Sequence, residues 1–301
     1  MTRAVAVLGL LAACAATAPW QTDLQQALAS ARACGRDLVV YFALPGREAS
    51  DRMQSTLQDP VVGRALRSLS FSAVVADGSV QARLYTAWIG GGEGMGIAVL
   101  DGGGRVYAAR PGPQDALELA AFLRSCAAAR DELAALRAAV TGLDARPQES
   151  HRLGCLLLEL GCRTQCEPLL LDAALAGVAD ARHQLARLYA LDGNVTAARR
   201  WLASAQKTPA AQVTEGYVLF KERKLKDAVA VLEVALKTEQ LGSDRQRALL
   251  YLGKALHENQ QDDRAVPLLT ALAAEGTGST FEAAARHTLS HVKDPQHGHS
   301  H

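Results

Sequence analysis

The cysteines are the side chains of this sequence that can take part in the most kinds of chemistry. Three of them, Cys155, Cys162 and Cys166, lie within a span of twelve residues. Thiols this close in sequence can form a structural disulfide, carry redox exchange or contribute to a metal site. His151 is the nearest further ligand, but the spacing matches no standard zinc finger, so we predict no metal site. We expect one structural disulfide, with inert thiols or a redox or metal role as the alternatives.

Two further cysteines, Cys34 and Cys126, lie near the ends of predicted helices at residues 21–33 and 113–127. A disulfide between them is one alternative, and it requires their Cα atoms to lie within about 7 Å of each other. A pair of partly buried thiols is the other. Both stay open, because neither spacing nor composition fixes the distance between the two helices.

The sixth cysteine, Cys14, belongs to an N-terminal segment that resembles an export signal. Arg3 precedes an apolar run at residues 4–13, which is too short for a membrane-spanning helix. The sequence Leu-Ala-Ala-Cys ending at Cys14 resembles the bacterial lipobox, which implies lipidation of that cysteine. Cleavage after Ala18 is the alternative, and we assign residues 1–19 to the signal. We therefore expect an exported bacterial protein, periplasmic or membrane-anchored through Cys14, in a compartment where disulfides persist.

A second place for chemistry is the loop between a predicted strand at residues 37–42 and the helical pattern after it. The strand is apolar and rich in β-branched and aromatic residues, which indicates burial. Residues in and around this region carry a likeness to a known family: Trp20, Ala27, Ala31, Val39, Val40, Tyr41, Phe42, Arg52 and Met53. They resemble the secreted branch of the thioredoxin-like family, whose two redox cysteines would occupy the positions of Arg47 and Ser50.

Arg47 and Ser50 cannot perform dithiol exchange, because one thiolate must attack and a second thiol must resolve the mixed disulfide. The family also places a cis-proline beside the dithiol, and that position falls near Met95. No proline occurs between residues 60 and 111, and a cis peptide bond is essentially a proline feature. The resemblance therefore implies a thioredoxin-like fold that has lost its redox chemistry.

The resemblance extends over residues 20–127 and implies an α/β domain. Further strands are predicted at residues 71–76, 97–100 and 105–109, the last two joined by an Asp-Gly hairpin turn. The glycine-rich segment at residues 90–96 lacks the Gly-Lys-Ser/Thr ending of a phosphate loop and precedes a strand. It therefore predicts a flexible loop and not a nucleotide site.

Residues 128–146 predict a helical connector, and residues 147–293 predict an all-helical domain with internal repeats. Each unit has a small residue in its first helix, a second small residue twelve positions later, and a leucine four positions beyond that. The sets are Gly154/Cys166/Leu170, Ala186/Ala198/Leu202, Gly216/Ala228/Leu232 and Gly253/Ala265/Leu269. This pattern resembles the tetratricopeptide repeat, whose helix pairs stack into an all-α solenoid. Residues 281–292 would cap it, and the His-rich tail at residues 294–301 leaves metal binding open.

The charge balance and the aromatic content exclude one class of function. Lys and Arg number 32 against 31 Asp and Glu, and aromatic residues are only 5% of the chain, so we expect no nucleic-acid partner. We expect no cofactor and no enzymatic activity, but a scaffold that binds a protein or peptide through the repeats. The main alternative is a thiol–disulfide oxidoreductase that uses Cys34 with Cys126, or the Cys155–Cys166 cluster. A purely structural lipoprotein is a third alternative.

Overall fold

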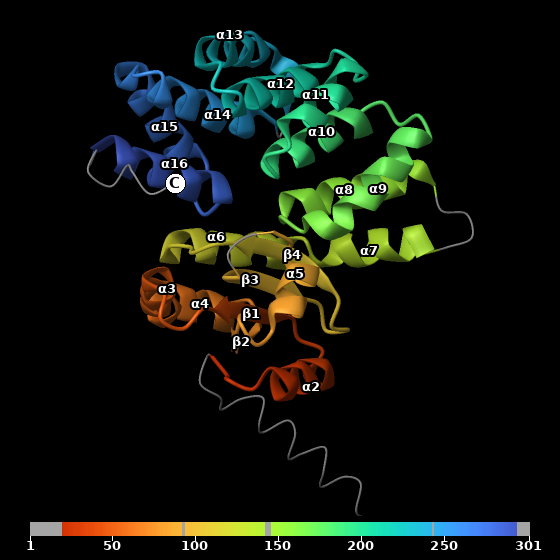
Figure 1. Cartoon of the computed structure of the whole chain (residues 1–301), viewed down its shortest axis with the longest axis vertical. Helices are drawn as coiled ribbons and strands as arrows, with labels where there is room; N and C mark the ends of the chain where they lie inside the picture. Colours follow the sequence, from red (N-terminus) through yellow and green to blue (C-terminus); the bar gives the residue numbers. More distant parts are fainter. Residues whose placement is uncertain (1–19, 92–93, 142–145, 243, 294–301) are drawn as a thin grey trace, which may run out of the picture. The chain divides into compact units, whose positions relative to one another are not determined.

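The computed structural model describes residues 20–91, 94–141, 146–242 and 244–293 (Figure 1). The chain divides into two compact units. The first comprises Met1–Asp131 together with Leu156–Cys166, and the second comprises Glu132–Cys155 together with Glu167–His301. The segment Leu156–Cys166, which lies in the predicted repeat region, therefore belongs to the same unit as the sheet.

The first unit is built on a four-stranded mixed sheet with strand order β2-β1-β3-β4. Strand β1 (Leu38–Ala43) runs parallel to β2 (Ser72–Asp77) and antiparallel to β3 (Gly96–Leu100), which pairs antiparallel with β4 (Val106–Pro111). All six residues of β1 are buried, which explains why this strand is an unbroken apolar run without alternation. The four strands predicted from the sequence are confirmed, with ends shifted by at most two residues.

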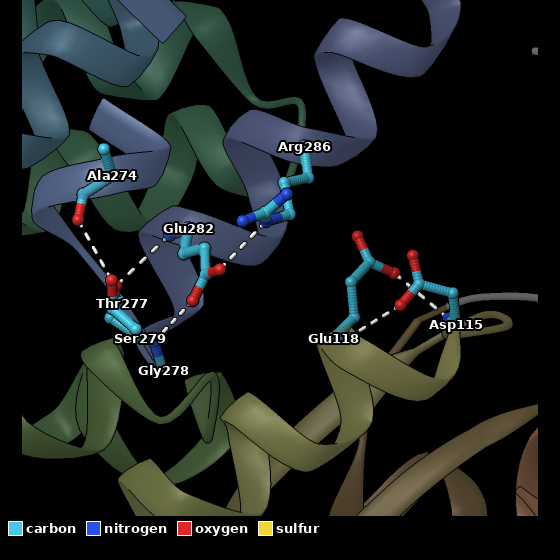
Figure 2. Close-up of polar contacts among 8 residues, drawn as sticks. All are labelled: Asp115, Glu118, Ala274, Thr277, Gly278, Ser279, Glu282 and Arg286. Atoms are coloured by element: carbon cyan, nitrogen blue, oxygen red, sulfur yellow. Dashed lines mark hydrogen bonds and ion pairs between the residues drawn. The ribbon is translucent and has the colours of Figure 1, made fainter. Parts of the chain in front are cut away.

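Helices accompany the sheet in chain order: α2 (Leu24–Cys34), α3 (Glu48–Gln58), α4 (Pro60–Ser68), α5 (Ala82–Trp88) and α6 (Ala116–Ala128). Local sequence explains where they begin. The side chain of Asp23 accepts a hydrogen bond from the Gln26 N–H at 2.9 Å and caps α2. At α6, Asp115 accepts from the Glu118 N–H at 2.7 Å and Glu118 accepts from the Asp115 N–H at 3.2 Å (Figure 2). This reciprocal capping box fixes the first turn of α6.

A buried polar network ties the start of β1 to the end of the unit. Tyr107 donates a hydrogen bond to Asp37 Oδ2 at 2.6 Å, and Arg130 Nε donates to the same oxygen at 2.7 Å. The Arg130 guanidinium also lies 4.4 Å from the centre of the Phe71 ring. Burial raises the pKa of Tyr107 well above its ordinary value, so the phenol remains a donor. The Asp37 carboxylate is thus buried with two strong donors, as a charge in the interior requires.

The edge strand β4 is covered by the segment Leu156–Cys166. The Ala109 N–H donates to the Leu160 carbonyl at 3.0 Å, so part of the outer edge of the sheet has a backbone partner. Gly161 follows with φ +76°, and a Cβ at that position would lie 2.2 Å from the Ala109 carbonyl oxygen. Only glycine satisfies both the backbone conformation and this close approach. This bond makes the Ala109 position of the edge unavailable to another strand.

The rest of the chain is helical. Its helices are α7 (Arg130–Thr141), α8 (Pro147–Glu159), α9 (Arg163–Leu175), α10 (Ala181–Leu191), α11 (Val195–Ala203), α12 (Pro209–Lys221), α13 (Leu225–Leu236), α14 (Asp244–Glu258), α15 (Asp262–Glu275) and α16 (Thr280–Lys293). A short 3₁₀ turn, Glu239–Leu241, connects α13 to α14. Successive helices pair, as Figure 1 shows for α12 with α13 and α14 with α15.

The predicted small-residue positions lie where paired helices touch, which confirms that part of the pattern. A Cβ added at Gly216 would lie 2.5 Å from Leu232 Cγ, and one at Gly253 would lie 2.5 Å from Leu269 Cδ2. At Gly154 the nearest atoms, in the side chain of Leu170, would lie 2.9 Å away. The second small residues of the four units are all fully buried: Cys166, Ala198, Ala228 and Ala265.

One core of the helical region joins α12 to α16. Its fully buried members include Leu232, Leu269, Leu272 and Ala285. Tyr217 stacks on Tyr251 with ring centres 4.3 Å apart and links α12 to α14. Among the helices in the described part of the chain, none combines the length and apolar character needed to cross a bilayer.

Candidate functional site

The loop after β1 places the two predicted redox positions at the start of α3. Arg47 is exposed and occupies the N-cap position, without a side-chain hydrogen bond to the helix. Ser50 is 2% exposed; its Oγ accepts from the Leu44 N–H at 3.2 Å and shares a hydrogen bond with the Tyr41 hydroxyl at 3.0 Å. Burial raises the pKa of Tyr41, so this phenol is no base for a serine nucleophile. The Ser50 hydroxyl is a packed structural group.

Loops at the same end of the sheet converge on Gly78. A Cβ at this glycine would lie 2.3 Å from the Gly94 carbonyl oxygen and 3.0 Å from that of Ala43. Met95, predicted near the lost proline position, is 5% exposed, and its carbonyl accepts from the Tyr85 hydroxyl at 3.2 Å. All peptide bonds within the described residues are trans. This end of the sheet is therefore closed by backbone contacts and carries no chemically reactive side chain among the residues predicted for it.

The two cysteines of the first unit are not bonded to each other. Cys34, the last residue of α2, takes part in a disulfide, whereas Cys126 is a fully buried thiol. The Cys34–Cys126 disulfide considered from the sequence is therefore not formed. Burial raises the pKa of Cys126 far above its ordinary value, because the apolar surroundings disfavour a thiolate. Cys126 accordingly lacks the properties of an attacking thiol.

The structural disulfide expected among the three clustered cysteines is not formed, because Cys155, Cys162 and Cys166 are all thiols, each with other contacts. Cys162 and Cys166 are fully buried, and Cys166 Sγ donates to the Arg163 carbonyl at 3.4 Å. Cys155 is partly buried on α8, with Sγ 3.3 Å from Nε2 of His151 one turn earlier. Burial lowers the pKa of His151, which favours a neutral imidazole beside a thiol. Two other predicted features, lipidation at Cys14 and the tail at residues 294–301, lie outside the described residues.

Sequence reasoning missed a group of buried polar side chains on the first helices of the pairs. His183 and Arg187 on α10 are 3% and 4% exposed, and Arg247 on α14 is 8% exposed. Gln184 bridges the first two, because its amide nitrogen lies 3.1 Å from His183 Nε2 and its oxygen accepts from Arg187 Nη1 at 3.1 Å. Arg247 forms an ion pair with Asp244. We call His183, Arg187 and Arg247 the first-helix cluster.

The charges around His183 show that the members of the first-helix cluster lie within electrostatic reach of one another. Burial lowers the pKa of His183 to about 4, Asp180 opposes this shift, and His151, Arg187 and Arg247 reinforce it. His183 is therefore neutral at pH 7 and accepts the Gln184 amide hydrogen bond. The signal available in the sequence was the spacing: His183 and Arg187 lie three residues before and one residue after the small residue Ala186, on one helix face.

Comparison with known proteins found no protein-family model and no curated protein that matches this chain. The fold itself defines an α/β unit with a four-stranded mixed sheet, followed by a mostly helical region of paired helices. Its function has to be inferred from the closed loop end of the sheet and from the first-helix cluster.

Proposed function

We propose that this protein is an exported interaction module, in which a thioredoxin-like domain without redox chemistry precedes tetratricopeptide-like repeats. The strand order and directions support the first half of this proposal, because a central strand parallel to β2 and antiparallel to β3 leads directly into a loop and a helix. The recurring contact of a small residue with a leucine sixteen positions later supports the second half.

The loss of redox chemistry has support beyond the missing thiols. Ser50 is buried and bonded to Tyr41 and to the backbone of Leu44, so the position is used for structure. The Arg47 side chain is exposed and can contribute only a positive charge. A domain with these properties can present a surface, but it has no group in this loop that exchanges electrons with a substrate.

The first-helix cluster is the observation that carries the interaction function. Burying guanidinium and imidazole groups has a free-energy cost that helix stacking does not require. The position of Arg187 is occupied in the other units by Cys155, Tyr217 and Lys254, so the fold accepts a thiol, a phenol or an ammonium there. Departures from an apolar interior are expected mainly at functional sites. We assign the first-helix face, which reaches solvent at the half-buried residues Gln184 and Lys254, as the surface that contacts a protein or peptide partner.

Site-specific photo-crosslinking in the native host tests this assignment. A photoreactive amino acid is placed at Gln184 or Lys254 on the first helices, and at the exposed residues Arg200 or Lys226 on the second helices as matched controls. Adducts of defined mass should form at the first two positions, and Arg187→Gln should reduce their yield. Equal yields at all four positions, or no adduct at Gln184 and Lys254, would contradict the proposed surface.

The proposed location in the bacterial envelope, with attachment to the membrane through Cys14, has its own test. Cys14→Ser should move the protein from the membrane fraction to the released fraction. The mass of the wild-type N-terminal peptide should include acyl chains on Cys14. A mature N-terminus after Ala18 without an acyl mass would refute lipidation and leave simple secretion.

The oxidoreductase alternative has less support. Cys126 is fully buried with a raised pKa, and Cys162 and Cys166 are also fully buried. Among the described cysteines outside a disulfide, Cys155 is the one that is partly buried and not fully buried, and it lies beside His151, so it is the thiol best placed for such an activity. Substitution of Cys155 therefore distinguishes the two functions in a disulfide-reductase assay.

A further inference from the structure

Two histidines on the last helix lie one turn apart with their side chains in contact. His287 and His291 on α16 have their Nε2 atoms 3.1 Å apart, and their ring centres are separated by 4.6 Å. Positions i and i+4 of a helix are neighbours on the same face, so the helix itself brings the two imidazoles together. His287 is exposed and His291 is half-buried, which makes the pair accessible from solvent.

The remainder of α16 fixes the backbone beneath this pair. Ala285 is fully buried in the core shared with α14 and α15, which orients the helix. At its start, Ser279 Oγ accepts from the Glu282 N–H at 3.2 Å, and Glu282 accepts from the Gly278 N–H and from Arg286 Nε, the latter at 2.8 Å (Figure 2). The buried Ala285 and the hydrogen bonds at the start of α16 both hold this helix in place within its own unit. The two imidazoles are therefore carried by a well-packed helix.

We propose that His287 and His291 form a bidentate site for a divalent transition metal ion of the Cu²⁺, Ni²⁺ and Zn²⁺ class. Metal–imidazole bonds are about 2.0–2.1 Å long, so two Nε2 atoms 3.1 Å apart subtend about 100° at the metal. This angle lies between the right angle of square-planar or octahedral coordination and the wider tetrahedral angle, so all three ions can be accommodated. Water would complete the coordination.

The ligand chemistry selects the metal class. Neutral imidazole suits Zn²⁺, Cu²⁺ and Ni²⁺, whereas Mg²⁺ and Ca²⁺ require oxygen ligands. Five of the eight histidines of the chain lie in its last fifteen residues, among them His297, His299 and His301 in the tail. The tail is a separate source of imidazole, and the site proposed here consists of His287 and His291 alone. Its test must therefore separate the two sources.

A metal bound to both imidazoles would also stabilise the fold. The ion binds the helical arrangement, and an unfolded chain does not place the two nitrogens together, so binding raises the apparent stability. Thermal unfolding thus provides a readout that does not depend on any activity. A hydrogen bond between the two imidazoles accounts for the same distance without a metal, and the titrations of the variants distinguish it from a metal site.

The experiment uses the full chain with the tail histidines removed as His297→Asn, His299→Asn and His301→Asn. Calorimetric titration with Cu²⁺, the tightest-binding ion of the series, should show one equivalent bound, and electron paramagnetic resonance should show nitrogen ligation. Adding His287→Asn or His291→Asn should weaken the Cu²⁺ affinity by at least about tenfold. The remaining imidazole then binds the ion without the second ligand that the helix holds close by at a high effective concentration.

A matched control exchanges two adjacent residues, His291→Val with Val292→His, and keeps the composition while moving the second imidazole off the shared face. This variant should bind as weakly as His287→Asn and should lose the Cu²⁺-induced rise in the thermal midpoint. Undiminished affinity in the exchanged variant would overturn the proposal. Absence of Cu²⁺ binding once the three tail histidines are replaced would overturn it as well, and would assign all binding to the tail.

Discussion

Replacing Gly216 by alanine tests the contact on which the stacked helices depend. The added Cβ would lie 2.5 Å from Leu232 Cγ, 2.7 Å from Cδ2 and 3.2 Å from Cδ1. Leu232 is fully buried in the core, so moving it away would disturb its packed neighbours. The equivalent glycine of the last unit, Gly253, meets Leu269 in the same way, so the effect should recur there.

The expected magnitude follows from two opposing contributions. Alanine in a helix interior is favoured over glycine by about 1 kcal/mol through its helix propensity. Overpacking of a well-filled core costs about 1–3 kcal/mol. With an overlap this deep against a buried side chain, the packing penalty should exceed the propensity gain. Gly216→Ala should therefore lower the free energy of unfolding by about 1–2 kcal/mol.

Urea denaturation followed by circular dichroism measures this change. Gly63→Ala on α4 is the matched control, because its added Cβ would meet only the flexible end of Arg67 at 3.4 Å. That control should be neutral or stabilising. Leu232→Val in the Gly216→Ala background should recover part of the loss, giving a non-additive double-mutant cycle. Equal gains for Gly216→Ala and Gly63→Ala would refute the close-packed contact.

Three further predictions concern pH, the sheet edge and the buried network. His183 is neutral in the folded state but takes up a proton when unfolded below pH 6.5, so stability should fall by up to about 3 kcal/mol as the pH drops from 6.5 to 4; denaturation of His183→Gln should show a smaller loss over that window. Gly161→Ala should lower the free energy of unfolding by about 2–4 kcal/mol, because of its positive φ and its contact with β4. Gly193 has a similar φ of +77° but nothing within 4 Å of an added Cβ, so Gly193→Ala should lose only the part that comes from the backbone conformation. Tyr107→Phe should lower the free energy of unfolding by about 1–3 kcal/mol, because Asp37 loses a buried donor; an unchanged urea midpoint would contradict this.

Features with a local period could be predicted from the sequence. The apolar run at residues 37–42 predicted a buried strand, and β1 at 38–43 is buried throughout, since burial on both faces removes the usual polar alternation. The small residues that begin at Gly154 predicted helix contacts, since close approach of two helices leaves no space for a larger side chain. Both signals are contained in a few consecutive turns or residues, so they do not depend on the rest of the fold.

Contacts between distant segments could not be predicted in this way. Asp37 meets Tyr107 and Arg130 only because the sheet register and the end of α6 bring them together. Cys34 and Cys126 lie at or near the ends of two helices, but helix ends carry no information about the distance between them. The first-helix cluster was missed for the same reason, since burial of His183 arises from the stacking of several helices and not from the composition of α10.

Reductase turnover with insulin as the disulfide substrate most directly separates an interaction module from an oxidoreductase. The full-length chain is assayed with dithiothreitol as the electron donor, beside Cys155→Ala and Cys126→Ala. Because Arg47 and Ser50 occupy the redox positions and Cys126 is buried, we predict that all three proteins give the rate of dithiothreitol alone. Turnover by the wild type that is abolished by Cys155→Ala would contradict the account and establish a thiol enzyme.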